Sequence, residues 1–174
     1  MMLTRRALLA AGGGLAAALA SPLTAVGASE VIEITMGGRE DGSHVWFDPI
    51  GILIKPGQTI RWTNLNSGNS HTTTAYHPAN FERALRIPKA AKSWNSEYLL
   101  PNESFSVLFM DKGVYDYFCI PHEHAGMVGR ILVGELEPGG WTETKSTDSD
   151  LPEEALRAFP TVKEIMTNRI VRRG

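Results

Sequence analysis

Residues 119–127 read CIPHEHAGM and contain the only cysteine of the 174-residue chain. Cys119, His122 and Met127 follow one another with the spacing C-x2-H-x4-M. Apolar segments that favour extended structure flank this stretch, residues 114–119 before it and 127–133 after it. One tight loop between two strands therefore presents a thiolate, an imidazole and a thioether to a common point, which restricts the chain to folds that can support such a loop.

These three donor types indicate a particular kind of metal site. A thiolate, imidazole nitrogen and a weak axial thioether form a blue-copper electron-transfer site once a second histidine is supplied. A lone cysteine is more often a small buried apolar residue, but the joint pattern of three ligand types on one loop favours copper.

The second histidine has two candidates, His71 and His77. His71 stands where the polar loop 64–70 gives way to an extended segment. His77 lies six residues further on, roughly 20 Å away in an extended strand. Both cannot bind one ion without a sharp reversal of the chain, and the loop before His71 favours that residue.

Short β-rich segments separated by turn residues dominate the chain from Glu30 to Gly134. Residues 59–63 alternate apolar and polar side chains, as a half-buried strand does. Seven or eight short strands with frequent turns predict an all-β sandwich or barrel. The expected strands cover residues 31–34, 44–47, 50–54, 59–63, 71–76, 104–110, 114–119 and 127–133.

Residues 77–100 interrupt the strand pattern with a long connection that contains a basic stretch and Trp94. A connection of this length in a compact domain usually has a function or local structure of its own. The alternative is an ordinary surface excursion. The basic residues are Arg83, Arg86, Lys89 and Lys92.

A polar linker and a helical tail follow at residues 138–174. Asp150 with Glu153, and Thr161 with Glu164, have the spacing of helix capping boxes, and Pro160 separates the two short helices that they would begin. The second helix would place three apolar residues on one face, which we expect to pack on the β domain. They are Val162, Ile165 and Met166.

Residues 1–28 have the pattern of an export signal. Arg5 and Arg6 precede a run rich in alanine, glycine and leucine, and the small residues at 26–28 predict cleavage before Ser29, with the paired arginines favouring the twin-arginine route. The alternative is an uncleaved membrane anchor, which the weak hydrophobicity of the run disfavours.

Charge and cysteine content restrict the function of the mature chain. Cleavage would remove two arginines and no acidic residue, which leaves 15 basic and 19 acidic residues and a net charge of −4. This mild acidity gives no basic surface for nucleic acid. A single cysteine in an exported protein cannot form an internal disulfide, so it is a buried thiol, an intermolecular crosslinker or a functional thiolate.

Three blocks of the sequence resemble the cupredoxins, most closely the plastocyanin and pseudoazurin branch. They are FDPIGILIKPGQTIRWTN at residues 47–64, NSH ending at His71, and VYDYFCIPHEHAGMVGRILV at residues 114–133. The last block is the most specific, with Pro121 between the cysteine and the histidine and Gly126 before the methionine.

The resemblance implies a Greek-key β-sandwich or barrel of seven to eight strands over residues 29–137, followed by a short helical tail. It also implies one type 1 copper that cycles between Cu(I) and Cu(II), with His122 as the exit for the electron. The insertion at 77–100 and the tail at 138–174 depart from the family pattern. The implied ligands are His71, Cys119, His122 and Met127.

His124 competes with His122, because a C-x4-H spacing also occurs in the azurin branch. Met127 would then follow the histidine too closely for that branch, so we expect His124 to be an exposed loop residue. We expect no metal role for His44, and a place beside the metal ligands or on the surface for His77.

A closed set of four protein ligands favours a one-electron carrier over an enzyme, and the export signal predicts a periplasmic or otherwise exported protein of a bacterium or archaeon. It would be a monomer without stable membrane insertion after signal cleavage, and its partners would be redox proteins such as a cytochrome or a periplasmic oxidoreductase. The alternatives are an electron-transfer subunit of a larger copper enzyme and a copper storage or delivery protein. An enzyme would need further copper sites, and a storage protein would favour histidine-rich or methionine-rich runs, which this sequence lacks.

Overall fold

The computed structural model describes residues 30–39, 41, 44–135 and 151–172. The predicted export signal, Asp150 and most of the predicted linker lie outside the described residues. Within the described ranges, no helix is long and apolar enough to cross a membrane.

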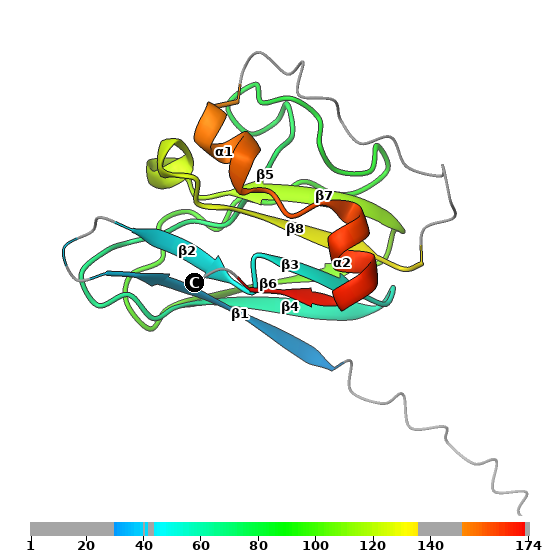
Figure 1. Cartoon of the computed structure of the whole chain (residues 1–174), viewed down its shortest axis with the longest axis horizontal. Helices are drawn as coiled ribbons and strands as arrows, with labels where there is room; N and C mark the ends of the chain where they lie inside the picture. Colours follow the sequence, from blue (N-terminus) through cyan, green and yellow to red (C-terminus); the bar gives the residue numbers. More distant parts are fainter. Residues whose placement is uncertain (1–29, 40, 42–43, 136–150, 173–174) are drawn as a thin grey trace, which may run out of the picture.

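Two β-sheets face each other in the described part of the chain (Figure 1). One has the strand order β2-β1-β4-β6 and the other β5-β7-β8-β3-β9. The first sheet consists of β1 (Val31–Gly38), β2 (Val45–Asp48), β4 (Gln58–Asn64) and β6 (Ser104–Phe109). The second consists of β3 (Gly51–Ile54), β5 (Thr74–Ala75), β7 (Gly113–Phe118), β8 (Val128–Val133) and β9 (Ile170–Val171).

Strands that are distant in the sequence pair within each sheet. β1 runs parallel to β4, and β3 runs parallel to β8, whereas β7 and β8 pair antiparallel on either side of the cysteine loop. This confirms the predicted all-β sandwich. The expected strand at 71–76 is reduced to β5, and His71 instead forms an isolated bridge with Leu99. β9 was not predicted, because two residues are too few to show periodicity.

The main core lies between the two sheets and is rich in aromatic rings. Trp62 packs edge-on against Tyr117 with ring centroids 5.4 Å apart. Other fully buried members come from strands of both sheets: Ile34, Met36, Phe47, Ile60, Ile131 and Val133. This core packs against one face of β7 and β8, the two strands that the cysteine loop connects.

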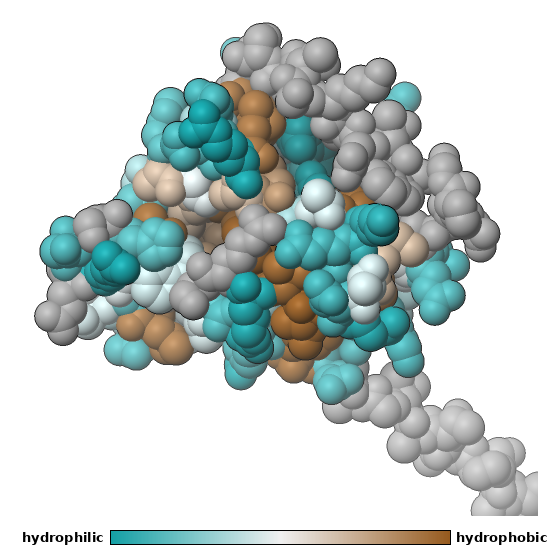
Figure 2. Space-filling view, viewed as in Figure 1, coloured by the Kyte–Doolittle hydropathy of each residue, from teal (hydrophilic) through white to brown (hydrophobic). Residues whose placement is uncertain are grey.

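The helical tail covers the outer face of the same strands. α1 (Glu153–Ala158) contacts η1 (Ile120–Ala125), a 3-10 turn in the cysteine loop, while α2 (Val162–Asn168) contacts β3 and β8 (Figure 1). All six residues of β8 are buried, because the core covers one face and the tail the other. Figure 2 shows hydrophilic side chains over much of the outer surface of these helices.

The two predicted helix starts have different outcomes. Thr161 caps α2, and its Oγ1 accepts a hydrogen bond from Glu164 N at 3.1 Å, as predicted. Asp150, the predicted cap of the first helix, lies outside the described residues, and α1 begins at Glu153, directly after Pro152.

The predicted apolar face of α2 is also correct only in part. Val162 and Ile165 are buried against the sheet, whereas Met166 is 39% exposed. Met166 follows Ile165 directly, and consecutive helical residues point about 100° apart, so Met166 turns away from the contact.

A buried ionic cluster joins the insertion, the sheet and the tail. The Asp116 carboxylate on β7 accepts hydrogen bonds from Arg86 of the insertion at 2.9 Å and from Arg130 of β8 at 2.7 Å. Arg130 also donates to the carbonyl of Pro160 at 2.9 Å, and both guanidinium groups lie over the ring of Phe159. The tail is therefore fixed to the domain by polar as well as apolar contacts.

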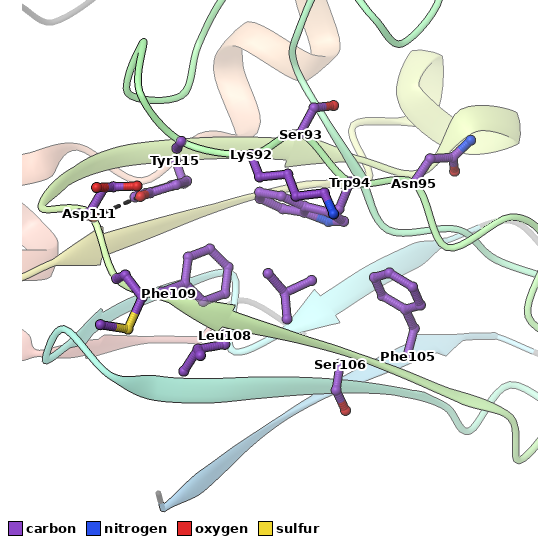
Figure 3. Close-up of a pocket in the computed structure, with 13 residues that line it drawn as sticks. Lys92, Ser93, Trp94, Asn95, Phe105, Ser106, Leu108, Phe109, Asp111 and Tyr115 are labelled. Atoms are coloured by element: carbon purple, nitrogen blue, oxygen red, sulfur yellow. Dashed lines mark hydrogen bonds between the residues drawn. The ribbon is translucent and has the colours of Figure 1, made fainter.

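Residues 77–100, all within the described part of the chain, form turns and isolated bridges, and they cover one edge of the sandwich. Ile87, Trp94 and Leu99 from this insertion are buried in the main core. A hollow of about 540 Å³ remains where the insertion crosses β6. Figure 3 shows Phe105 and Phe109 of β6 and Trp94 of the insertion in its walls. The insertion is thus a structural part of the domain, unlike an ordinary surface excursion.

Candidate metal centre

The cysteine loop closes on itself through backbone hydrogen bonds. Cys119 precedes η1 in an extended conformation, and its N–H donates to the carbonyl of Met127 at 3.0 Å. Met127 N–H donates in turn to His122 O at 3.1 Å. Gly126 ends the turn with φ 79°, a left-handed conformation that favours glycine. These bonds hold the three loop residues of interest around one short turn.

Three donor atoms converge at this loop. Nδ1 of His71 lies 3.1 Å from Nδ1 of His122, and Sγ of Cys119 lies 3.7 Å and 3.4 Å from these two nitrogens. A point in the plane of the three atoms is therefore about 2.0 Å from each. Bonds from divalent zinc to imidazole nitrogen and thiolate sulfur are about 2.0–2.1 Å and about 2.3 Å long, so the spacing fits a first-row metal ion.

Met127 is the last residue of the cysteine loop, directly before β8. Its side chain is fully buried, and its backbone is bonded to both Cys119 and His122. This places the residue on the same turn as the donor atoms, beside the core that supports β7 and β8.

Backbone contacts fix the position of His71, which comes from a separate part of the chain. Its N–H and carbonyl pair with those of Leu99 at 3.2 Å and 2.8 Å. The Leu99 carbonyl also accepts from Asn64 Nδ2 at 2.9 Å. The insertion therefore holds the histidine that reaches the cysteine loop.

Thr72 links the two halves of the site. Its backbone N–H donates to Cys119 Sγ at 3.3 Å, and its hydroxyl accepts from Ile120 N at 2.8 Å. A hydrogen bond to the sulfur stabilises thiolate character and influences the electronic properties of a bound metal.

Burial sets the protonation of the donors before metal enters. Burial, with a smaller effect of the neighbouring His122 ring, lowers the pKa of His71 to about 4, and burial also lowers the pKa of His122. Burial raises the pKa of the Cys119 thiol to about 11, against the opposing effect of the Thr72 N–H. At neutral pH both imidazoles therefore offer free lone pairs, and metal binding must release the thiol proton.

The remaining histidines lie apart from the three donors. His77 Nδ1 accepts a hydrogen bond from the backbone of Ala79 at 3.0 Å, within its own turn. His124 is exposed on η1, and His44 stacks on Trp46 with centroids 5.1 Å apart. Within the described ranges, His71, Cys119 and His122 are the one group of His, Cys, Asp and Glu residues whose ligand atoms all lie close together, within 4.8 Å of one another.

Glu123 was not identified from the sequence as part of the site. Its side chain is only 1% exposed although it lies between His122 and the exposed His124. The carboxylate contacts Tyr76 and Arg83, which are 47 and 40 residues away in the sequence. The sequence shows that a charged residue stands in the loop. It does not predict that this residue binds Tyr76 and Arg83, because both are far away in the sequence.

Known proteins are similar to this chain over the region that contains the donor residues. The family described as "Copper binding proteins, plastocyanin/azurin family" matches residues 33–134, more than half of the chain. Plastocyanin of Scenedesmus fuscus is 34% identical over 105 residues, which cover 58% of this chain and 99% of that protein. Chloroplastic plastocyanin of Oryza sativa subsp. indica is 32% identical over 133 residues, 76% of this chain and 82% of that protein.

Coverage is smaller in some relatives. The match to chloroplastic plastocyanin of Tetradesmus obliquus is 35% identical over 100 residues, covering 55% of this chain and 63% of that protein. Among solved structures, a pseudoazurin from Sinorhizobium meliltoi shares 27% identity, with a TM-score of 0.45 over 61% of this chain and 76% of that chain.

Proposed function

Because this chain belongs to the plastocyanin/azurin family of copper-binding proteins, we propose that it is an exported one-electron carrier with a single type 1 copper. The proposed ligands are the two imidazoles, the thiolate and the thioether of His71, His122, Cys119 and Met127.

The observation that carries this proposal is the triangle of Nδ1, Nδ1 and Sγ atoms with sides of 3.1, 3.4 and 3.7 Å. Two imidazoles and a thiolate in a trigonal arrangement, with a weak axial thioether, are typical of blue-copper sites. Bound copper would supply a reversible one-electron change between Cu(I) and Cu(II).

The surrounding residues would keep the site rigid during this change. His71 and Cys119 are fully buried, and hydrogen bonds to Leu99 and Thr72 hold them in place. Rigid donors limit the rearrangement that accompanies a change of charge. His122 is the half-buried donor of the three, so we assign the passage of the electron to its outer edge.

A closed ligand set favours a carrier over an enzyme. Catalytic metal sites keep an open position for water or substrate, whereas four protein ligands would leave little room for either. The separation of His44, His77 and His124 from the donor triangle also offers no support for a further copper centre among the described residues.

Copper titration of the mature protein tests the proposal. We expect one copper per chain, an intense thiolate-to-copper band in the visible spectrum, and a reversible one-electron wave in voltammetry. C119S is the control, because it removes the thiolate from a fully buried position and should abolish the band while the β domain remains folded. A colourless Cu(I) form that transfers readily to a chelator would instead support copper storage or delivery.

We also propose export to the periplasm or a comparable location of a bacterium or archaeon. The paired arginines, the alanine-rich run and the small residues before Ser29 support it. The proposed partners of the monomer are redox proteins such as a cytochrome or a periplasmic oxidoreductase. An N-terminus near Ser29 on protein isolated from its native compartment would agree with export, and a retained residue 1 would contradict cleavage.

A further inference from the structure

Glu123 places a buried carboxylate within the loop that carries His122. Its Oε1 accepts a hydrogen bond from the Tyr76 hydroxyl at 2.8 Å, and its Oε2 accepts from Arg83 Nη2 at 2.5 Å. Both carboxylate oxygens therefore have a donor. A buried carboxylate is retained at little cost only when it is paired and hydrogen-bonded, so the loop is favoured in the one position where both contacts are made.

Tyr76, which binds this carboxylate, is itself held firmly in the domain. The ring of Tyr76 is fully buried and packs against Phe118, with centroids 4.5 Å apart. Its backbone N–H donates to Asp116 O of β7 at 3.1 Å, and its carbonyl accepts from Arg86 N at 3.0 Å. The hydroxyl that binds Glu123 is thus held by a residue bonded on both sides.

Arg83 contacts the segment before the cysteine as well as the loop after it. Its guanidinium lies 5.4 Å from the centre of the Phe118 ring while it binds Glu123. Phe118 directly precedes Cys119, and Glu123 directly follows His122. One side chain of the insertion therefore contacts the residues next to two of the three proposed loop ligands, Cys119 and His122.

We propose that Glu123 is a positioning residue of the copper centre, whose carboxylate, held by Tyr76 and Arg83, fixes the loop that presents His122. This rests on the proposed copper function and assigns the insertion a role in it. The carboxylate acts through His122, so its loss should increase the freedom of that ring rather than remove a ligand.

E123Q tests this with little change in shape. The glutamine oxygen still accepts from Tyr76, but its NH2 group then faces the donors of Arg83 and cannot accept from them. In the metal-free protein we expect the amides of residues 120–126 to exchange with solvent about tenfold faster, while the amides of β4 and β7 keep their rates. In the copper protein we expect a shifted reduction potential, broadened copper hyperfine lines and an electron self-exchange rate lower by about tenfold.

E82Q is the matched control, because Glu82 is exposed, neighbours Arg83 in the sequence and undergoes the same change of charge. E82Q should leave the amide exchange rates, the reduction potential, the copper hyperfine lines and the electron self-exchange rate unchanged.

Y76F is a milder variant that removes only the hydroxyl that binds Glu123. It should change these four quantities in the same direction as E123Q, by a smaller factor. It keeps the test available if E123Q does not fold.

Wild-type rates and spectra in both E123Q and Y76F would overturn the proposal. Exchange that accelerates equally in the loop and in β4 and β7 would also overturn it, because Glu123 would then stabilise the domain as a whole. The hydrogen-exchange measurement needs no metal. Failure of the copper proposal, seen as a wild-type protein without a visible band, is therefore distinguishable from failure of this inference.

Discussion

At the scale of single residues, the metal centre depends on side chains whose environments differ sharply over a few positions. In the loop, Cys119 is fully buried, His122 is half-buried, Glu123 is buried and His124 is exposed. Two histidines that are two residues apart thus differ in exposure, and the buried Glu123 lies between them. The 3-10 turn produces this difference, because it points neighbouring side chains in different directions.

Met127→Gln should keep the visible band and lower the reduction potential. An amide oxygen is a harder ligand than a thioether and favours Cu(II), and the axial ligand influences the potential of such sites. A tenfold change in relative affinity corresponds to about 59 mV for a one-electron couple, so we expect a decrease of at least about that size by voltammetry.

The control is Met110→Gln, because Met110 is 60% exposed and lies at the hollow beside the insertion. The reduction potential of the Met110→Gln variant should equal that of the wild-type protein. An unchanged potential in the Met127 variant would remove Met127 from the proposed ligand set.

At the scale of elements, the cysteine loop is supported from two sides. The insertion reaches it through Arg83, and α1 packs against η1 on another side. A side chain at Gly126 would have its Cβ 3.3 Å from the carbonyl oxygen of Glu154 in α1, in addition to the strain of its positive φ. Neither supporting element is a strand of the sandwich, yet both contact the loop that connects β7 and β8.

Asp116→Asn should destabilise the protein strongly, because it leaves two buried guanidinium groups without the carboxylate between them. Breaking a buried ion pair by removing one partner costs about 3–5 kcal/mol, and urea unfolding of the metal-free protein measures this loss.

The matched comparison is Glu33→Gln, which breaks the ion pair between Glu33 and Arg61. The side chain of Glu33 is 44% exposed and that of Arg61 is 50% exposed. Such a surface pair contributes about 0–1 kcal/mol. Equal losses in the two variants would show that the Asp116 cluster does not fix the insertion and the tail to the sheet.

At the scale of the whole molecule, the metal would join parts of the chain that are far apart in the sequence. His71 comes from the segment before the insertion, and the other proposed ligands come from residues 119–127. An unfolded chain does not hold these donors together, so copper should bind the folded state preferentially and raise its stability.

Removal of copper should therefore lower the melting temperature. Ligand at about 1,000 times its Kd stabilises a protein by about 4 kcal/mol, and each kcal/mol shifts Tm by about 2–4 °C in a domain of this size. We expect a difference of about 10 °C between the loaded and chelated protein in calorimetry. C119S should gain less from added copper, and equal melting temperatures of loaded and metal-free wild type would contradict preferential binding to the folded state.

Local patterns in the sequence predicted much of the fold. Residues 59–63 alternate as a half-buried strand, and the capping residue Thr161 marks the start of α2, as the structure shows. Asp150, the other predicted cap, lies outside the described residues, and α1 begins at Glu153, directly after Pro152. β9 and the shortened strand at 74–75 depend on which neighbours are present, and this is a property of the assembled sheet.

The sequence by itself determined the donor types and their order on the cysteine loop, because spacing within one turn is a local property of the chain. Only the tertiary structure decided which distant side chains meet that loop. It brought His71 rather than His77 to Cys119 and His122, and it buried Glu123 between Tyr76 and Arg83. Those contacts depend on the packing of the insertion and the tail against the sandwich, where burial and hydrogen-bond pairing across long sequence separations determine the arrangement.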